Sequence, residues 1–169
     1  DIKDSGDVTV ERVVAENGSI NVASEGEMTA KSVSSETDHD NNDVTLTAGE
    51  GGIDIGQIVA GLVGDITLST GGTVEKLEDG KGHVKGGDFK VTSGGGVSLD
   101  TSVDTLDIET SGVGHVDIKD SGHLTVERVV VENGSITVSA EGQIKANLIT
   151  SETDHDNNDV TLTAGVEGI

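Results

Sequence analysis

The amino-acid sequence predicts an all-β fold, a right-handed parallel β-helix (β-solenoid) with about 20 residues per coil. Three observations support this prediction: a long internal repeat, a recurring short strand pattern, and a near-absence of aromatic side chains. Repeated units that stack on one another bury a continuous core, and short half-buried strands suit such stacking. Small aliphatic side chains can then fill a narrow interior without aromatic rings.

The first observation is a repeat of 116 residues. Residues 1–53 align without a gap with residues 117–169, and 38 of the 53 positions are identical. The block S-E-T-D-H-D-N-N-D-V-T-L-T-A-G occurs unchanged at Ser35–Gly49 and at Ser151–Gly165. We therefore expect residues 1–116 to form one complete super-repeat and residues 117–169 to begin the next, within a single continuous solenoid. Such a chain is expected to be a window on a longer array.

The second observation is a pattern of two apolar residues separated by one polar residue, as in Ile20/Val22 and Ile66/Leu68. This alternation predicts strands of about five residues with one buried face, and Gly, Asn, Asp and Ser between them predict turns. Equivalent positions are separated by 21, 23, 19 and 20 residues, in the order Ile53, Val74, Val97, Val116 and Ile136. This spacing predicts about six coils in each 116-residue unit and about eight in the whole chain.

The third observation concerns what the core can contain. Phe89 is the one aromatic residue, and the chain has neither proline nor cysteine. A β-sandwich needs bulky side chains to fill the gap of about 10 Å between its sheets, so we expect stacked coils instead. The regular placement of β-branched residues argues against a disordered chain. Helices are nearly excluded, because no segment sustains helical spacing and glycine is frequent, and the best candidate, Gln57–Leu62, would make only about one and a half turns.

The charge balance narrows the range of partners. The net charge is −22, from 32 acidic and 10 basic residues. This balance argues against nucleic acid because too few cations are present to neutralise phosphates, and equally against anionic membrane surfaces. No apolar run reaches 18 residues, so we expect no membrane insertion. An acidic surface suits a well-solvated fibre in surroundings rich in salt or cations.

Two segments are similar to the repeats of filamentous-haemagglutinin-like exoproteins, which are large bacterial adhesins. They are G-D-I-T-L-S-T-G-G-T-V (Gly64–Val74) and N-D-V-T-L-T-A-G-E-G-G-I-D-I-G (Asn42–Gly56). The resemblance covers most of the chain and lies in the style of the repeat. It implies a right-handed parallel β-helix, secretion to the cell surface, and a role in adhesion or in displaying a distal tip. Stalks of this kind carry no catalytic residues, so the resemblance implies none here.

The segment T-D-H-D-N-N-D is the best candidate for a binding site and occurs at 37–43 and at 153–159. Its oxygen-bearing side chains lie at i, i+2 and i+4, a spacing that lets a loop wrap a hard cation such as Ca²⁺. The alternative is a solvated acidic loop whose Asp and Asn residues supply turn conformations. The candidate calcium ligands are Asp38, Asp40, Asn42 and Asp43 in the first copy and Asp154, Asp156, Asn158 and Asp159 in the second.

A glycine-rich segment, Leu77–Asp88, interrupts the coil spacing. It is either a flexible insertion or a local charge reversal that docks on an acidic neighbouring fibre. The lysines within and beside it are Lys76, Lys81, Lys85 and Lys90.

These properties predict a structural stalk or spacer of a large extracellular bacterial adhesin or surface fibre that mediates adhesion. The alternative is a self-assembling extracellular filament or sheath subunit in which contacts between fibres are the function. Expected partners are neighbouring repeats of the same chain, like fibres, and glycans or proteins on a host or neighbouring cell surface. The expected location is extracellular or at the cell surface, and Ca²⁺ is the one candidate cofactor. No enzyme activity is expected, because aromatic platforms for sugars and nucleophile arrangements are lacking.

Overall fold

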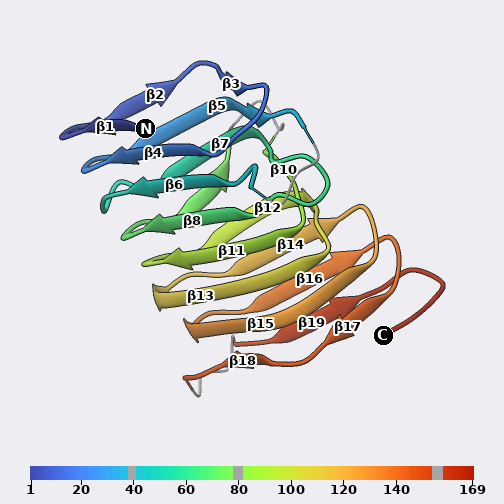
Figure 1. Ribbon diagram of the computed structural model, residues 1–169. Coiled ribbons are helices and arrows are strands. Elements are labelled where there is room, and N and C mark those ends of the chain that lie inside the picture. Colours follow the sequence, from blue (N-terminus) through green and yellow to red (C-terminus); the bar gives the residue numbers. More distant parts are fainter. Residues whose placement is uncertain (38–40, 78–81, 154–157) are drawn as a thin grey trace.

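The computed structural model describes residues 1–37, 41–77, 82–153 and 158–169, and within these ranges it contains 19 β-strands and no helix. Every strand pair in this part of the chain is parallel. The strands form two sheets, and the chain passes from one sheet to the other and back in each coil (Figure 1). The fold is therefore a β-solenoid, as the sequence predicts.

We name the two broad sheets sheet 1, with nine strands, and sheet 2, with ten. In spatial order, sheet 1 contains β1 (Ile2–Asp4), β4 (Ile20–Ser24), β6 (Val44–Ala48), β8 (Ile66–Thr70), β11 (Asp88–Ser93), β13 (Thr105–Val113), β15 (Leu124–Asn133) and β17 (Ile144–Ala146), with β18 (Ile149–Ser151) also beside β15. Sheet 2 contains β2 (Val8–Val10) and β3 (Val13–Ala15) beside β5 (Met28–Ser35), then β7 (Ile53–Val59), β9 (Val74–Lys76) and β10 (His83–Lys85), β12 (Val97–Ser102), β14 (Val116–Asp120), β16 (Ile136–Ala140) and β19 (Val160–Thr163).

The core consists of ladders of aliphatic side chains that repeat from coil to coil. In sheet 2, neighbouring strands place five residues in one ladder, in the order that their sequence spacing predicts: Ile53, Val74, Val97, Val116 and Ile136. All five are at most 1% exposed. Because each residue stacks on its counterpart in the next coil, one short apolar pattern builds a core of any length.

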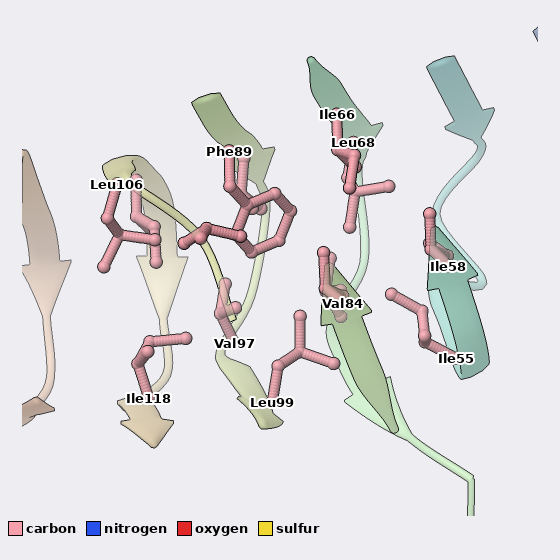
Figure 2. Close-up of a cluster of buried hydrophobic side chains, with 14 of the residues drawn as sticks. Ile55, Ile58, Ile66, Leu68, Val84, Phe89, Val97, Leu99, Leu106 and Ile118 are labelled. Atoms are coloured by element: carbon pink, nitrogen blue, oxygen red, sulfur yellow. The ribbon is translucent and has the colours of Figure 1, made fainter. Parts of the chain in front are cut away.

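The two sheets pack their inner faces against each other. Figure 2 shows side chains from the two sheets pointing toward one another across a narrow interior. The labelled residues of sheet 1 are Ile66, Leu68, Phe89 and Leu106, and those of sheet 2 are Ile55, Ile58, Val84, Val97, Leu99 and Ile118. Phe89 pairs with Ile66 and Leu106 on its two sides, so the ring occupies an ordinary ladder position.

Equivalent strands in the two copies of the super-repeat belong to opposite sheets of the solenoid. Strand β6 belongs to sheet 1, whereas its counterpart β19, with the same residues V-T-L-T, belongs to sheet 2. Likewise β4 of sheet 1 corresponds to β16 of sheet 2. The offset of 116 residues spans five and a half coils, close to the expected number of about six, and the half coil moves the counterpart of each strand to the other sheet. Both sheets bury the same alternating pattern, so the sequence does not mark which sheet a strand joins.

Two local segments also bear on the sequence expectations. Gln57–Val59, in the best candidate for a helix, continues strand β7, because buried Ile58 pairs with Val33 and Val84 of the adjacent strands. The glycine-rich insertion is not a loop throughout: His83–Lys85 forms strand β10 between β7 and β12. Residues 78–81 of that insertion lie outside the described residues.

Glycines form a column at one edge of the solenoid. The N–H of Gly26 donates to the carbonyl of Gly6 at 3.2 Å, and the N–H of Gly49 donates to the carbonyl of Gly26 at 2.8 Å. The N–H of Gly71 continues the column and donates to Gly49 at 3.1 Å. A Cβ atom added at Gly49 would lie 1.8 Å from the carbonyl oxygen of Glu25. The coils at this edge therefore stack backbone on backbone, and a side chain would separate them.

This geometry predicts that Gly49→Ala destabilises the fold by at least about 2 kcal/mol, because the added methyl group must push two coils apart. Gly122→Ala is the matched control, since a Cβ there meets only the Asp120 carboxylate at 3.4 Å. Urea unfolding followed by circular dichroism measures both variants. Equal losses of stability in the two variants would contradict the stacking of backbone on backbone at Gly49.

Candidate functional site

The first T-D-H-D-N-N-D segment is closed by a buried asparagine. The Asn42 side chain is 0% exposed. Its Oδ1 accepts a hydrogen bond from the N–H of Gly18 at 2.8 Å, and its amide nitrogen donates to the carbonyl oxygen of Thr37 and, at 2.6 Å, to the Thr37 hydroxyl. Asn42 therefore joins the two ends of the segment and fixes them to the neighbouring coil, and its amide oxygen is already engaged.

The second segment is closed in the same way. The amide nitrogen of Asn158 donates to the carbonyl oxygen and to the hydroxyl of Thr153, both at 2.7 Å. The first segment runs from sheet 2 to sheet 1 and the second from sheet 1 to sheet 2, so the closure does not depend on the face. The contact spans five residues and is set by local sequence.

The structure places some of the candidate calcium ligands. Asp43 accepts a hydrogen bond from the N–H of Asp65 at 3.2 Å through Oδ1, and Asp159 is exposed. The other four carboxylates, Asp38, Asp40, Asp154 and Asp156, lie outside the described residues. Within the described ranges, no group of three or more His, Cys, Asp or Glu side chains could hold a metal ion. Calcium binding by these loops stays a prediction.

Side chains in several turns connect one coil to the next by accepting its backbone N–H groups. Asp7 accepts from Glu27 at 2.9 Å, and Asp65 accepts from Asp88 at 3.4 Å, as Asp43 does from Asp65. Such bonds satisfy donors that would otherwise meet no partner at the start of a strand. Part of the acidity of the chain is therefore structural, which composition alone does not show.

Two histidines serve the same purpose. The Nδ1 atom of His123 accepts from the N–H of Gln143 at 3.0 Å, and Nδ1 of His115 accepts from the N–H of Ser135 at the same distance. His123 occupies the position that Asp7 holds in the first copy, and Gln143 occupies that of Glu27. The acceptor is thus preserved although the residue type changes. Sequence reasoning missed this role because the partners are 20 residues apart.

A cluster of ion pairs lies on the outer face of sheet 1. Arg128 donates through Nε to Asp107 at 2.9 Å and through Nη2 to Glu109 at 2.6 Å. The Lys90 ammonium lies 3.9 Å from the other oxygen of Asp107. The hydrogen bonds with Glu109 and Asp107 raise the pKa of Arg128. Four charged side chains on three neighbouring strands therefore compensate one another.

An open hollow of about 390 Å³ lies on the outer face of sheet 2 and is lined in part by His83, Asp100, Lys119 and Asp120. Asp100 lies 3.4 Å from the Lys76 ammonium. The Asp120 carboxylate, 4% exposed, accepts three hydrogen bonds, from the Thr101 hydroxyl at 2.7 Å and from the N–H groups of Val103 at 3.1 Å and Gly122 at 2.7 Å. Both carboxylates are thus engaged within the chain. The expectation that the chain is not an enzyme stays a prediction.

Comparison of the chain with known protein families, with curated proteins and with solved structures finds no match. The part of the chain that the structure describes holds no helix able to cross a membrane.

We predict that Asn42→Ala destabilises the fold by about 2–3 kcal/mol, because it removes three hydrogen bonds and leaves the Gly18 N–H without its acceptor. The exposed neighbour Asn41 provides the control: Asn41→Ala is expected to change stability by less than about 0.5 kcal/mol. Thermal and urea unfolding measure both variants. A stable Asn42→Ala variant would show that the closure contributes nothing.

Thermal unfolding in the presence of Ca²⁺ tests whether the two T-D-H-D-N-N-D segments bind calcium. If the loops bind Ca²⁺, millimolar calcium raises the midpoint of thermal unfolding, because binding favours the folded state. The double variant Asp38→Asn/Asp154→Asn is expected to abolish this rise, and Mg²⁺ at the same concentration controls for ionic strength. An unchanged midpoint of the unmodified chain across the titration would exclude a stabilising site.

Proposed function

We propose that the chain is a length of structural spacer within an extracellular bacterial surface fibre or adhesin. The observation that carries this proposal is the unbroken stacking of sheet 2 from Val8 to Val160, through strand pairs in which equivalent residues follow at intervals of 19 to 25 residues. Each added coil repeats the contacts of the previous one, so length grows without a change in the core.

The distribution of contacts suits a rigid rod. Every coil is joined to its neighbours by backbone hydrogen bonds between strands, and side-chain acceptors such as Asp7 and His123 and the glycine column reinforce some of these junctions. These interactions lie along the fibre axis and recur about every 4.8 Å. A rod built in this way resists bending because both sheets would have to change their spacing together.

The extracellular adhesin role is supported by the style of the repeats, which resembles filamentous-haemagglutinin-like exoproteins. The net charge of −22 supports a fibre that stays well solvated in surroundings rich in salt. Both arguments concern the array as a whole and assign no ligand to this segment.

The proposal predicts how length depends on the number of units. Ile169 corresponds to Ile53, so a further copy of residues 54–169 appended after Ile169 continues the repeat in phase. Each appended unit adds five and a half coils and is expected to lengthen the particle by about 26 Å at constant width. Electron microscopy and small-angle X-ray scattering of arrays with one to four added units measure this increment. Particles that grow in all dimensions would overturn the spacer function.

A further inference from the structure

The structure separates the charge of the chain into two regions. The 96 strand residues carry 8 basic and 11 acidic groups. The described residues outside the strands carry 15 acidic groups and one basic group, Arg12. The turns join the two sheets along the edges of the solenoid (Figure 1), so these edges are strongly acidic and the two broad faces are close to neutral.

One area of each broad face has no charged residue at all. Strands β4, β6 and β8 form this area on sheet 1, and β16 and β19 form it on sheet 2. We call these areas hydroxyl patch 1 and hydroxyl patch 2. The outward residues of patch 1 are Asn21, Ala23, Thr45, Thr47, Thr67 and Ser69, in register across the three strands, and those of patch 2 are Thr137, Ser139, Thr161 and Thr163.

The half-coil in the super-repeat places the patches on opposite faces. Patch 2 corresponds in sequence to the β4 and β6 part of patch 1, and the two would lie on the same face if the unit held a whole number of coils. A solenoid of this repeat therefore presents the same surface in two opposite directions. On any one face the patch recurs after two units, which is about 53 Å along the axis.

We propose that the hydroxyl patches are the surfaces through which a second copy of this chain packs, broad face against broad face. Contact between edges brings acidic turns together, whereas contact between patches brings no like charges together. Because each molecule carries patches on both faces, such contacts extend into layers and do not close into a dimer. This inference rests on the proposed spacer function and identifies the partner of its lateral surface as a like fibre.

The area of a patch determines how strongly two chains are expected to associate. Three neighbouring strands of five residues cover on the order of 200 Å², far below the roughly 800 Å² that each partner contributes to a stable interface. A single chain is therefore expected to associate weakly. Arrays with several units offer several patches at fixed spacing, and the apparent association constant is expected to rise at least about 100-fold between the 169-residue chain and an array with four added units.

Sedimentation velocity and electron microscopy of the chain and of this array test the proposal, in low salt and in 0.5 M NaCl (about 4 Å screening length). The variant Thr47→Asp/Thr163→Asp, repeated in each unit, adds a charge at equivalent exposed positions of both patches. The matched control Ser5→Asp/Ser121→Asp adds the same charge at equivalent exposed turn positions. We expect bundles from the unmodified array and from the control, and single rods from the patch variant, with unchanged unfolding midpoints.

A cross-linking experiment tests the same contact in case the aspartate variant of the patches folds poorly. The chain has no cysteine, so Thr47→Cys/Thr163→Cys reports the contact directly. Mild oxidation is expected to link these molecules into a ladder of oligomers and to leave Ser5→Cys/Ser121→Cys mostly monomeric. Equal cross-linking of the two variants, or unmodified arrays that stay single under all conditions, would overturn the proposal. Single rods of the expected length would contradict lateral packing but would leave the spacer function intact. Arrays that bind cellulose without associating would also overturn the proposal, because the patches would then bind carbohydrate.

Discussion

The parallel register between successive coils is the constraint on which the rest of the structure depends. Each strand must start in phase with the strand above and the strand below, so additional residues can be accommodated only between strands or in a bulge. A bulge lies between the pairs Leu106/Val126 and Asp107/Arg128 and leaves Glu127 without a partner residue in the strand β13. It shows such an adjustment inside a sheet. Coil length therefore varies while the ladders of the core stay continuous.

The same constraint explains why one sequence segment can serve on either face. Both sheets require aliphatic residues inside and small polar residues outside, and V-T-L-T satisfies this requirement in β6 and in β19. The turns are equally transferable, because Asn42 and Asn158 close their segments through contacts within five residues. A duplicated unit of five and a half coils is therefore accepted without any change in the alternating pattern that builds the core.

These features also decide how much could be predicted from the sequence. The fold and the ladder from Ile53 to Ile136 were predictable, because alternation and spacing are direct consequences of stacking. The half coil in the 116-residue offset was not predictable, because neither sheet has a residue pattern of its own. The extension of β7 through Gln57–Val59 was not predictable either, because Ile58 pairs with Val33 and Val84, which lie far away along the chain. The acceptor role of His123 depends on a contact 20 residues away and has no local signal.

Charge follows from the same geometry. An outward side chain in a strand has a counterpart about 4.8 Å away on each side, so like charges in one ladder repel at about 0.9 kcal/mol per pair even in water and several times more near a protein surface. The Arg128 cluster on sheet 1 replaces this repulsion with ion pairs. Turns project into solvent, where salt screens their charges and where Asp43 and Asp65 accept backbone hydrogen bonds. Acidity is therefore tolerated at the edges, and the broad faces stay nearly neutral because the ladders themselves select against net charge.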